Sequence, residues 1–120
     1  MLKRVVQDPA AGKPSADPIF VDGSVEIQQL VSDEDTELLR VTSVTFQGGA
    51  HNRPHRHTCD QVLIATHGRG FIATDDENLE LDPGDVILVP KDTRHWHGAQ
   101  PETDFTHISI LTPSVMTLAD

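Results

Sequence analysis

The feature that most constrains the fold is a series of short β-branched segments separated by turn-forming residues. Six such segments follow one another from Val25, at 25–30, 38–46, 61–66, 70–74, 85–89 and 105–111. Glycine, proline, aspartate and asparagine fill the intervening stretches and interrupt any run long enough for a helix. Many short strands at this spacing are typical of an antiparallel sandwich or barrel. We therefore predict an all-β fold.

The chain divides unequally into an arm and a barrel. Its 120 residues suit one domain with a proper core. Residues 1–18 contain three prolines and little periodicity. We therefore expect residues 1–24 to form an extended arm, which pairs with the barrel or with a partner subunit, and residues 25–120 to form the barrel.

Charge and composition exclude several classes of partner. The formal net charge is −10, whereas nucleic acids and anionic membranes require clustered Lys and Arg. An ordinary acidic surface explains this charge, and adaptation to a high-salt cytoplasm is the alternative.

The N-terminal residues lack the apolar stretch of a secretory signal, and no apolar run approaches the ~20 residues of a membrane span. The single cysteine, Cys59, excludes an intramolecular disulfide. We predict a cytoplasmic protein.

Two pairs of histidines, each with i, i+2 spacing, are the residues most suited to chemistry. His55 and His57 form one pair, and His95 and His97 form the other. Residues two apart on a strand project from the same face, so two imidazoles can share one centre. Gln61 begins the strand predicted after His57 and can point back across a turn. Three imidazoles and one amide oxygen suit divalent Mn, Fe, Co, Ni or Zn, with positions left for substrate or water.

The sequence around these histidines resembles the two motifs of the cupin superfamily. The first motif, G-x5-H-x-H-x(3,4)-E-x6-G, is matched by Gly49, His55, His57, Gln61 in the glutamate place, and Gly68. The second, G-x5-P-x-G-x2-H-x3-N, is matched by Gly84, Pro90, Asp92 in the glycine place, His95, and Ala99 in the asparagine place. The motifs and their strands cover about residues 38–112.

The resemblance implies a double-stranded β-helix, which is a small jelly-roll barrel with a metal inside. It implies that the ligands are His55, His57, Gln61 and His95, and that the protein is a homodimer. A closer resemblance, carried by the H-x-H-x3-Q and HWHGA segments and the downstream TH, is to small bacterial cupins that include manganese-dependent hydroxynitrile lyases. That likeness implies manganese as the metal, with iron, nickel, cobalt or zinc as alternatives, and places His97 and His107 beside it.

The glutamine bears on the type of reaction. A neutral ligand in place of glutamate leaves the charge of a divalent metal uncompensated, which strengthens a Lewis acid and makes a trivalent state harder to reach. We therefore expect redox-neutral lyase or addition chemistry on a small hydroxyl or carbonyl substrate, with His97 or His107 as the general base. The residues expected to line the substrate pocket are Thr42, Val44, Asn52, Leu63 and Leu111. Their mostly apolar character favours a small, apolar substrate.

Two other classes of function stay open. One is a different cupin enzyme, either a dioxygenase or a sugar or uronate isomerase. The other is a metal-dependent sensor or small-molecule-binding module without catalysis. Oxygen uptake would identify the dioxygenase, whereas ligand-dependent thermal stabilisation without turnover would identify the binding module.

Overall fold

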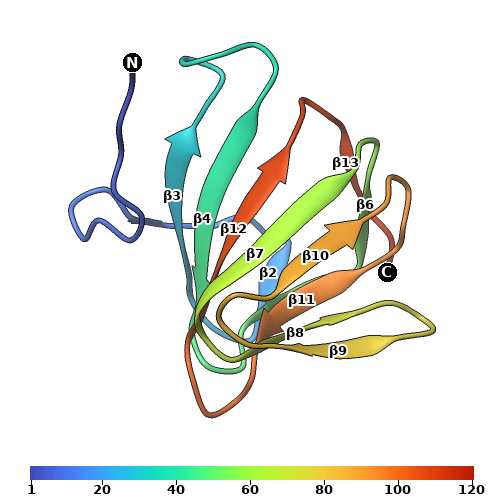
Figure 1. Cartoon of the computed structure of the whole chain (residues 1–120). Coiled ribbons are helices and arrows are strands. Elements are labelled where there is room, and N and C mark those ends of the chain that lie inside the picture. Colours follow the sequence, from blue (N-terminus) through green and yellow to red (C-terminus); the bar gives the residue numbers. More distant parts are fainter.

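The computed structural model describes all 120 residues as strands, turns and loops, without a helix (Figure 1). The larger sheet has the order β1 (Lys13–Pro14), β3 (Val25–Val31), β4 (Arg40–Phe46), β12 (Phe105–Leu111), β7 (Gln61–Gly68) and β10 (Val86–Val89). The second sheet has the order β2 (Phe20–Val21), β5 (His51–Asn52), β11 (Trp96–Ala99), β8 (Gly70–Ala73) and β9 (Asn78–Leu81). A third ladder joins β6 (His55–His57) to β13 (Met116–Leu118).

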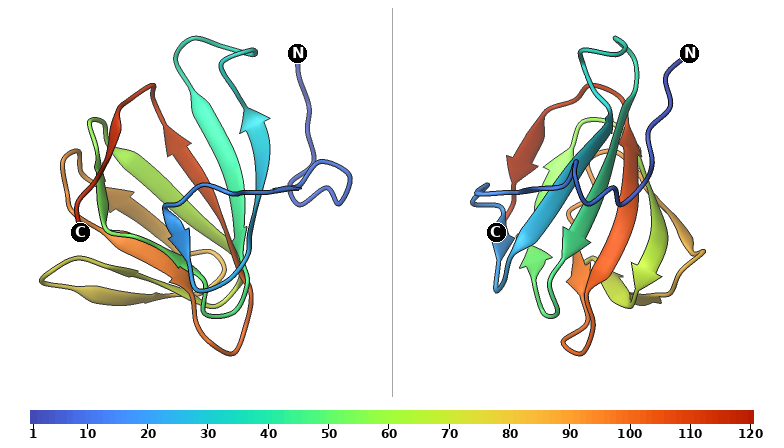
Figure 2. Two further views of the ribbon diagram at one scale, coloured as in Figure 1. Left: turned by 180° about the vertical axis from the view of Figure 1, so that it is seen from behind. Right: turned by 90° about the vertical axis from the view of Figure 1, so that its left-hand side faces the viewer.

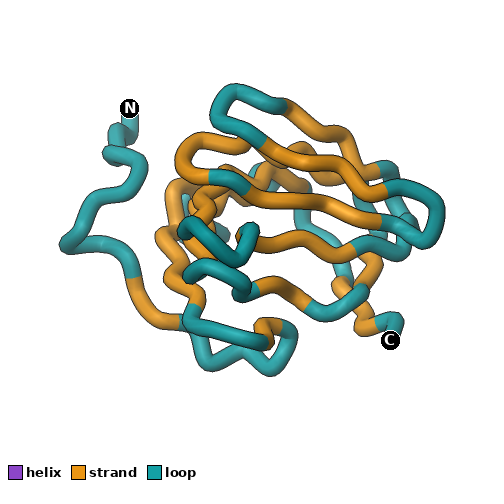
Figure 3. The backbone as a smooth tube through the Cα atoms, turned by 90° about the horizontal axis from the view of Figure 1, so that it is seen from below, coloured by secondary structure: helices purple, strands orange, loops and turns teal.

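The two large sheets curve around one interior, and the result is the jelly-roll barrel that the sequence predicts. Figure 3 views this barrel from below, with the strands wrapped around the interior. All six predicted strands are present, as β3, β4, β7, β8, β10 and β12. The prediction of an all-β jelly roll is confirmed. The structure has no helix that is long enough and apolar enough to cross a membrane.

The hydrophobic core lies between the sheets and follows the alternation of their strands. Along β7 every second residue from Gln61 to Ala65 is buried. Phe46, Leu63 and Phe105 are each at most 1% exposed, and the rings of the two phenylalanines stack with centroids 6.5 Å apart. Burying a side chain of this size stabilises the fold by roughly 1.5–3 kcal/mol. The core therefore fixes the positions of β4, β7 and β12.

Two motif positions, Gly68 and Asp92, lie in turns where the backbone has a positive φ, which restricts the residue types that fit there. Gly68 has a φ of 73°, and a Cβ there would collide with the carbonyl oxygen of Asp104. Asp92 occupies the place of a motif glycine and has a φ of 63°. This left-handed conformation is one that aspartate tolerates better than most residues. The substitution at position 92 therefore preserves the turn that leads to His95.

The N-terminal residues pair with the barrel through two very short strands. β1 pairs with β3, β2 pairs with β5, and Arg4 forms an ion pair with Asp35 at 2.7 Å. Figure 2 shows this segment passing along the outside of the larger sheet beside β3. In this chain the arm thus contacts its own barrel.

Near the C-terminus, β13 lies along the strand that bears the first histidine pair. Met116 is opposite His57, and Leu118 is opposite His55. Beyond β13, the Arg94 Nε donates to the carbonyl oxygen of Ala119 at 2.6 Å, and Arg53 pairs with Asp120. These contacts hold β6 against the barrel wall, although β6 belongs to neither large sheet.

Candidate metal centre

The two histidine pairs meet because the strands that carry them are bridged. His55 and His95 exchange two backbone hydrogen bonds, with N···O distances of 3.0 and 3.1 Å. This reciprocal pair fixes the register between β6 and the start of β11. It brings the two imidazoles to a centroid separation of 4.3 Å. Both side chains are buried, at 2% and 1% exposure.

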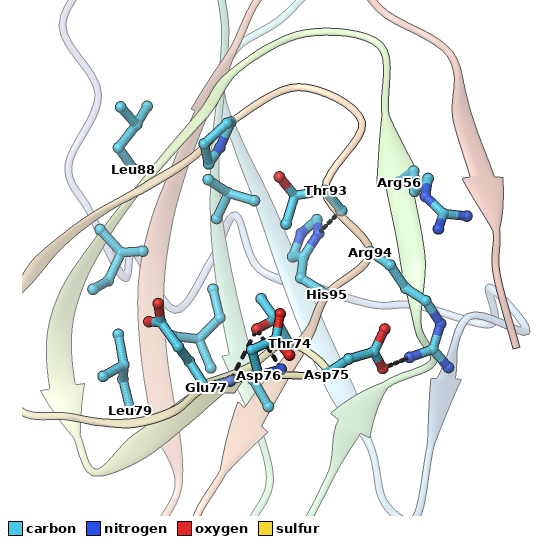
Figure 4. Close-up of a pocket in the computed structure, with 15 residues that line it drawn as sticks. Arg56, Thr74, Asp75, Asp76, Glu77, Leu79, Leu88, Thr93, Arg94 and His95 are labelled. Atoms are coloured by element: carbon cyan, nitrogen blue, oxygen red, sulfur yellow. Dashed lines mark hydrogen bonds and ion pairs between the residues drawn. The ribbon is translucent and has the colours of Figure 1, made fainter.

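Backbone carbonyls orient both of these rings. The Nδ1 of His55 lies 2.7 Å from the carbonyl oxygen of Arg53. The Nδ1 of His95 lies 2.8 Å from the carbonyl oxygen of Thr93, a contact drawn in Figure 4. A carbonyl oxygen only accepts, so each Nδ1 carries the proton of the neutral ring. Each Nε2 is left with an unprotonated lone pair. This is the arrangement in which metal-binding histidines are commonly held.

Gln61 presents its amide oxygen to the same place. Its Nε2 donates to Ser109 Oγ at 2.8 Å, while its Oε1 lies 3.3 Å from the Nε2 of His95. Since that imidazole nitrogen has no proton, two lone pairs face each other. A cation between them would satisfy both, and nitrogen with amide oxygen suits a divalent transition metal. The residues present therefore fit such an ion.

The cluster of nitrogens differs from the expected ligand set in one respect. One ring nitrogen from each of His55, His95 and His97 lies within 4.8 Å of the others, so these three histidines could hold a metal ion. His57 is not among these three, although its ring centroid is 5.0 Å from that of His55 and 5.7 Å from that of His95. The corresponding distances for His97 are 5.9 and 5.8 Å. The role of His57 as a ligand stays a prediction.

A cavity of about 200 Å³ opens beside the cluster inside the barrel. Both histidines expected to be catalytic, His97 and His107, line it, and their ring centroids are 4.9 Å apart. Of the expected pocket residues, Val44 and Asn52 line the cavity. Its wall contains no acidic side chain. The interior beside the cluster is thus small and free of fixed negative charge.

Three expected pocket residues lie elsewhere. Leu63 points inward as predicted, but at 1% exposure it is part of the hydrophobic core rather than the cavity wall. The hydroxyl of Thr42 lies 3.5 Å from Gln29 Oε1 on the neighbouring strand. Leu111 is the last residue of β12 and is partly exposed. None of the three borders the cavity.

Five residues that sequence reasoning did not place in the pocket also line the cavity, namely Ile19, Phe20, Phe46, Ser109 and Met116. Ser109 lies on the same strand face as His107, so alternation along β12 could have identified it. Met116 belongs to β13, a three-residue strand without a recognisable pattern. No local signal could have placed it beside the histidines.

Burial keeps the clustered imidazoles neutral near pH 7. It lowers the pKa of His55 from 6.5 to about 4, and the neighbouring His95 adds to the effect by charge repulsion. The same two causes lower the pKa of His57 to about 4. Burial lowers the pKa of His107 to about 4, and that of His97 well below its ordinary value. Neutral imidazoles are the form that binds metals and accepts protons.

A second cavity, of about 470 Å³, reaches His95 from the flank of the barrel (Figure 4). Its walls combine apolar residues of β10 with the acidic turn between β8 and β9. At its edge, Arg94 pairs with Asp75 at 2.5 Å. His95 therefore borders this flank cavity and is not part of the wall of the interior one.

Comparison with known proteins gives one family and several relatives. The model of the Cupin domain matches residues 42–110. An (R)-mandelonitrile lyase from Granulicella tundricola is 39% identical over 110 residues, which are 91% of this chain and 82% of that protein. An acireductone dioxygenase from Exiguobacterium sibiricum is 36% identical over 63 residues, but the match covers only 48% of this chain and 35% of that enzyme.

Among solved structures, a cupin-like protein from Thermotoga maritima superposes with a TM-score of 0.83 and 31% sequence identity. The superposition covers 97% of this chain and 90% of that one.

Proposed function

Because this chain belongs to the cupin family, we propose that it is a metal-dependent enzyme that performs hydroxynitrile lyase-like chemistry. The observation that carries the proposal is the chemistry of the cluster, in which imidazoles and one amide oxygen converge without any carboxylate in the cavity wall. The identity of 39% with a mandelonitrile lyase over most of the chain supports the same reaction. The substrate class is a small molecule with a hydroxyl or carbonyl group.

In this proposal the ion is divalent, with manganese as the first choice and iron, nickel, cobalt or zinc as alternatives. His55, His57, Gln61 and His95 would hold it. When bound, it supplies Lewis acidity toward a substrate oxygen. The neutral amide of Gln61 adds no negative charge, and therefore leaves that acidity undiminished.

In this proposal, side chains of the protein transfer the proton and contact the apolar part of the substrate. A neutral imidazole of His97 or His107 accepts the hydroxyl proton, the bond between the carbinol and nitrile carbons breaks, and the electron pair leaves with cyanide. The same imidazole returns the proton to cyanide, and an aldehyde is released. General-base catalysis of this kind contributes roughly 10²–10⁴-fold. Val44 and Phe46 give the cavity an apolar wall against which the apolar part of the substrate would pack.

The direct test is to mix manganese-loaded protein with mandelonitrile and to follow benzaldehyde. We expect release well above that from free Mn²⁺ and from the His55→Ala variant. Absence of release above free Mn²⁺, with metal content confirmed by elemental analysis, would exclude this activity.

A dioxygenase is the second candidate, because the acireductone dioxygenase relatives match about half of the chain. Consumption of dissolved oxygen by the Fe²⁺-loaded protein, with a diketone or acireductone-type substrate, would favour it. A sugar or uronate isomerase would turn over without oxygen or aldehyde release. A metal-dependent binding module would gain thermal stability with a ligand and show no turnover.

We also propose that the protein is a cytoplasmic homodimer. The family resemblance implies the dimer, and the single cysteine favours the location. Val86 and Leu88 on β10 are each 63% exposed and would be available to a partner subunit. Residues 1–24 would form the arm and residues 25–120 the barrel. Light scattering coupled to gel filtration would report a mass of one chain or two.

A further inference from the structure

We propose that Asn52 is a positioning residue that fixes the tautomer of His97, so that the neutral ring carries its proton on Nδ1 and donates a hydrogen bond into the cavity. The catalytic use of this donor rests on the proposed function. The tautomer itself does not, because it follows from hydrogen bonds within the protein.

The orientation of the Asn52 amide is set by a group that can only donate. The backbone N–H of His97 donates to Asn52 Oδ1 at 2.9 Å. This contact identifies the oxygen of the amide, and its nitrogen is thereby the atom that faces the His97 ring. That nitrogen, Nδ2, lies 3.0 Å from the Nε2 of His97. An amide nitrogen donates and does not accept, so Nε2 must be the acceptor.

The pair has little freedom to rearrange. Asn52 and His97 are each 4% exposed, and they lie on the paired strands β5 and β11. Turning the amide over would set its NH2 group against the backbone N–H of His97, whichever ring nitrogen carries the proton. Two donors would then face each other away from water, an arrangement that buried polar atoms avoid. One hydrogen-bond pattern is therefore strongly preferred.

The proton of neutral His97 consequently lies on Nδ1. This atom is buried and has no partner within the protein. The ring lines the interior cavity, where a substrate would provide the missing acceptor. A protonated Nδ1 cannot bind a metal, and Nε2 is held by Asn52. His97 therefore acts as a hydrogen-bond donor although its ring lies within the histidine cluster.

This assignment separates the roles of the two remaining histidines. Both ring nitrogens of His107 are buried without a partner, so its unprotonated nitrogen is free to accept a proton. The hydroxyl proton of the substrate passes to His107, while His97 Nδ1–H donates to the oxygen on which negative charge develops. As the carbon–carbon bond breaks, the electron pair leaves with cyanide, which takes the proton back from His107. Donors aimed at such an oxygen are among the larger contributions to catalysis.

The tautomer can be read directly by NMR. Protein with ¹⁵N-labelled histidine is compared in metal-free and zinc-loaded forms, and the signals of His97 are assigned by their loss in His97→Ala. We expect a protonated, pyrrole-type Nδ1 and an unprotonated, pyridine-type Nε2. A protonated Nε2 in the unmodified protein would overturn the proposal, whatever the variants do.

The Asn52→Asp variant is designed to reverse the assignment. A carboxylate accepts from the backbone N–H as before, but it also accepts from the ring and cannot donate to it. We expect the proton to move to Nε2. The matched control is Gln28→Glu, which also introduces a buried acid, at a residue 5% exposed whose amide donates to the carbonyl oxygen of Val5. That control should leave the His97 signals unchanged, and an unchanged tautomer in Asn52→Asp would contradict the proposal.

Kinetics then test whether the tautomer matters for the reaction. With mandelonitrile, Asn52→Asp should lower kcat by on the order of 10²-fold, while KM and bound metal stay close to those of the parent. A reversed tautomer with unchanged kcat would refute the catalytic role of the donor. If the parent protein has no lyase activity, the proposed function fails, and the NMR measurement still decides the tautomer.

Discussion

The side-chain nitrogen of Gln61 donates to Ser109 Oγ at 2.8 Å, and in this orientation the amide oxygen faces His95. The two residues lie on neighbouring strands, β7 and β12, which pair along their length. Ser109 therefore orients a candidate ligand without being one itself.

Replacing Ser109 should weaken metal binding. In Ser109→Ala the amide of Gln61 loses the acceptor that orients it, and metal affinity should fall by roughly 10–100-fold, as is usual when a partner of a ligand is removed. Titration of the metal-free protein with Mn²⁺, followed by electron paramagnetic resonance, measures the change. Ser43→Ala is the control, since Ser43 is also buried, on neighbouring β4. Equal affinities in the two variants would show that the Gln61–Ser109 bond has no role.

The Gln61→Glu variant should separate metal binding from catalysis. A carboxylate adds negative charge to the ligand set, so the metal should be held at least as tightly. The same charge should reduce Lewis acidity and lower kcat for mandelonitrile by about tenfold, or about 1.4 kcal/mol in the barrier. Steady-state kinetics at equal metal content provide the comparison, with Gln100→Glu as a control outside the cavity. A higher kcat in the Gln61→Glu variant than in the parent would argue against Lewis-acid chemistry.

Removing single histidines should distinguish the ligands from their neighbours. Elemental analysis of protein purified without added metal should find a transition metal, and His55→Ala and His95→Ala should lose it. His57→Ala should lose much of it, whereas His97→Ala should retain it, since Asn52 occupies the Nε2 of His97. The reverse order for the last two variants would make His97 the third imidazole ligand. Less than about a tenth of an equivalent in the parent protein would count against the whole site.

The metal-free protein should become less stable as the pH falls below 6.5. Burial lowers the pKa of His55 and His107 from 6.5 to about 4, so between these values the unfolded chain binds more protons than the folded one. The contribution of these two histidines to the free energy of unfolding is fully present above pH 6.5 and is lost as the pH falls toward 4. Each group adds a slope of at most about 1.4 kcal/mol per pH unit. Urea denaturation at a series of pH values measures it.

A variant tests the origin of this slope. His107→Gln keeps a polar side chain of similar size but removes one titrating group at a fully buried position. Its unfolding free energy should depend less steeply on pH than that of the parent. Identical slopes would show that His107 titrates alike in the folded and unfolded chain.

The predictions from sequence succeeded where the physical signal was local. β-branched runs bounded by turns identified β3, β4, β7, β8, β10 and β12, because each of these strands carries its own pattern. The four-residue strands β9 and β11 were not identified, since their sequences, NLEL and WHGA, contain no β-branched residue. The strands β5, β6 and β13 have two or three residues, and only tertiary pairing defines them. The i, i+2 histidines were nevertheless recognised, since their spacing is itself the strand period.

The candidate pocket was harder to predict for a geometric reason. Alternation gave the inward direction of Val44 and Leu63 correctly, yet only Val44 reaches the cavity. Alternation predicts which face of the sheet a side chain lies on. It does not predict where along the barrel axis the interior is filled by side chains and where a cavity remains. The hydrogen bond between Asn52 and His97 joins residues far apart in the chain, so no local pattern could reveal it.

The pairing of β6 with β13 has a consequence for the order of folding. Met116 and Leu118 lie opposite His57 and His55, so this ladder closes a loop of about 60 residues, a separation at which loop-closure entropy slows pairing. On a ribosome, β6 would emerge long before its only ladder partner. The histidine-bearing strand would thus remain incompletely held until residues 116–118 had been synthesised, and an ion captured earlier would meet a flexible, low-affinity site. Metal uptake would thereby be coupled to completion of the barrel rather than to the appearance of the histidines.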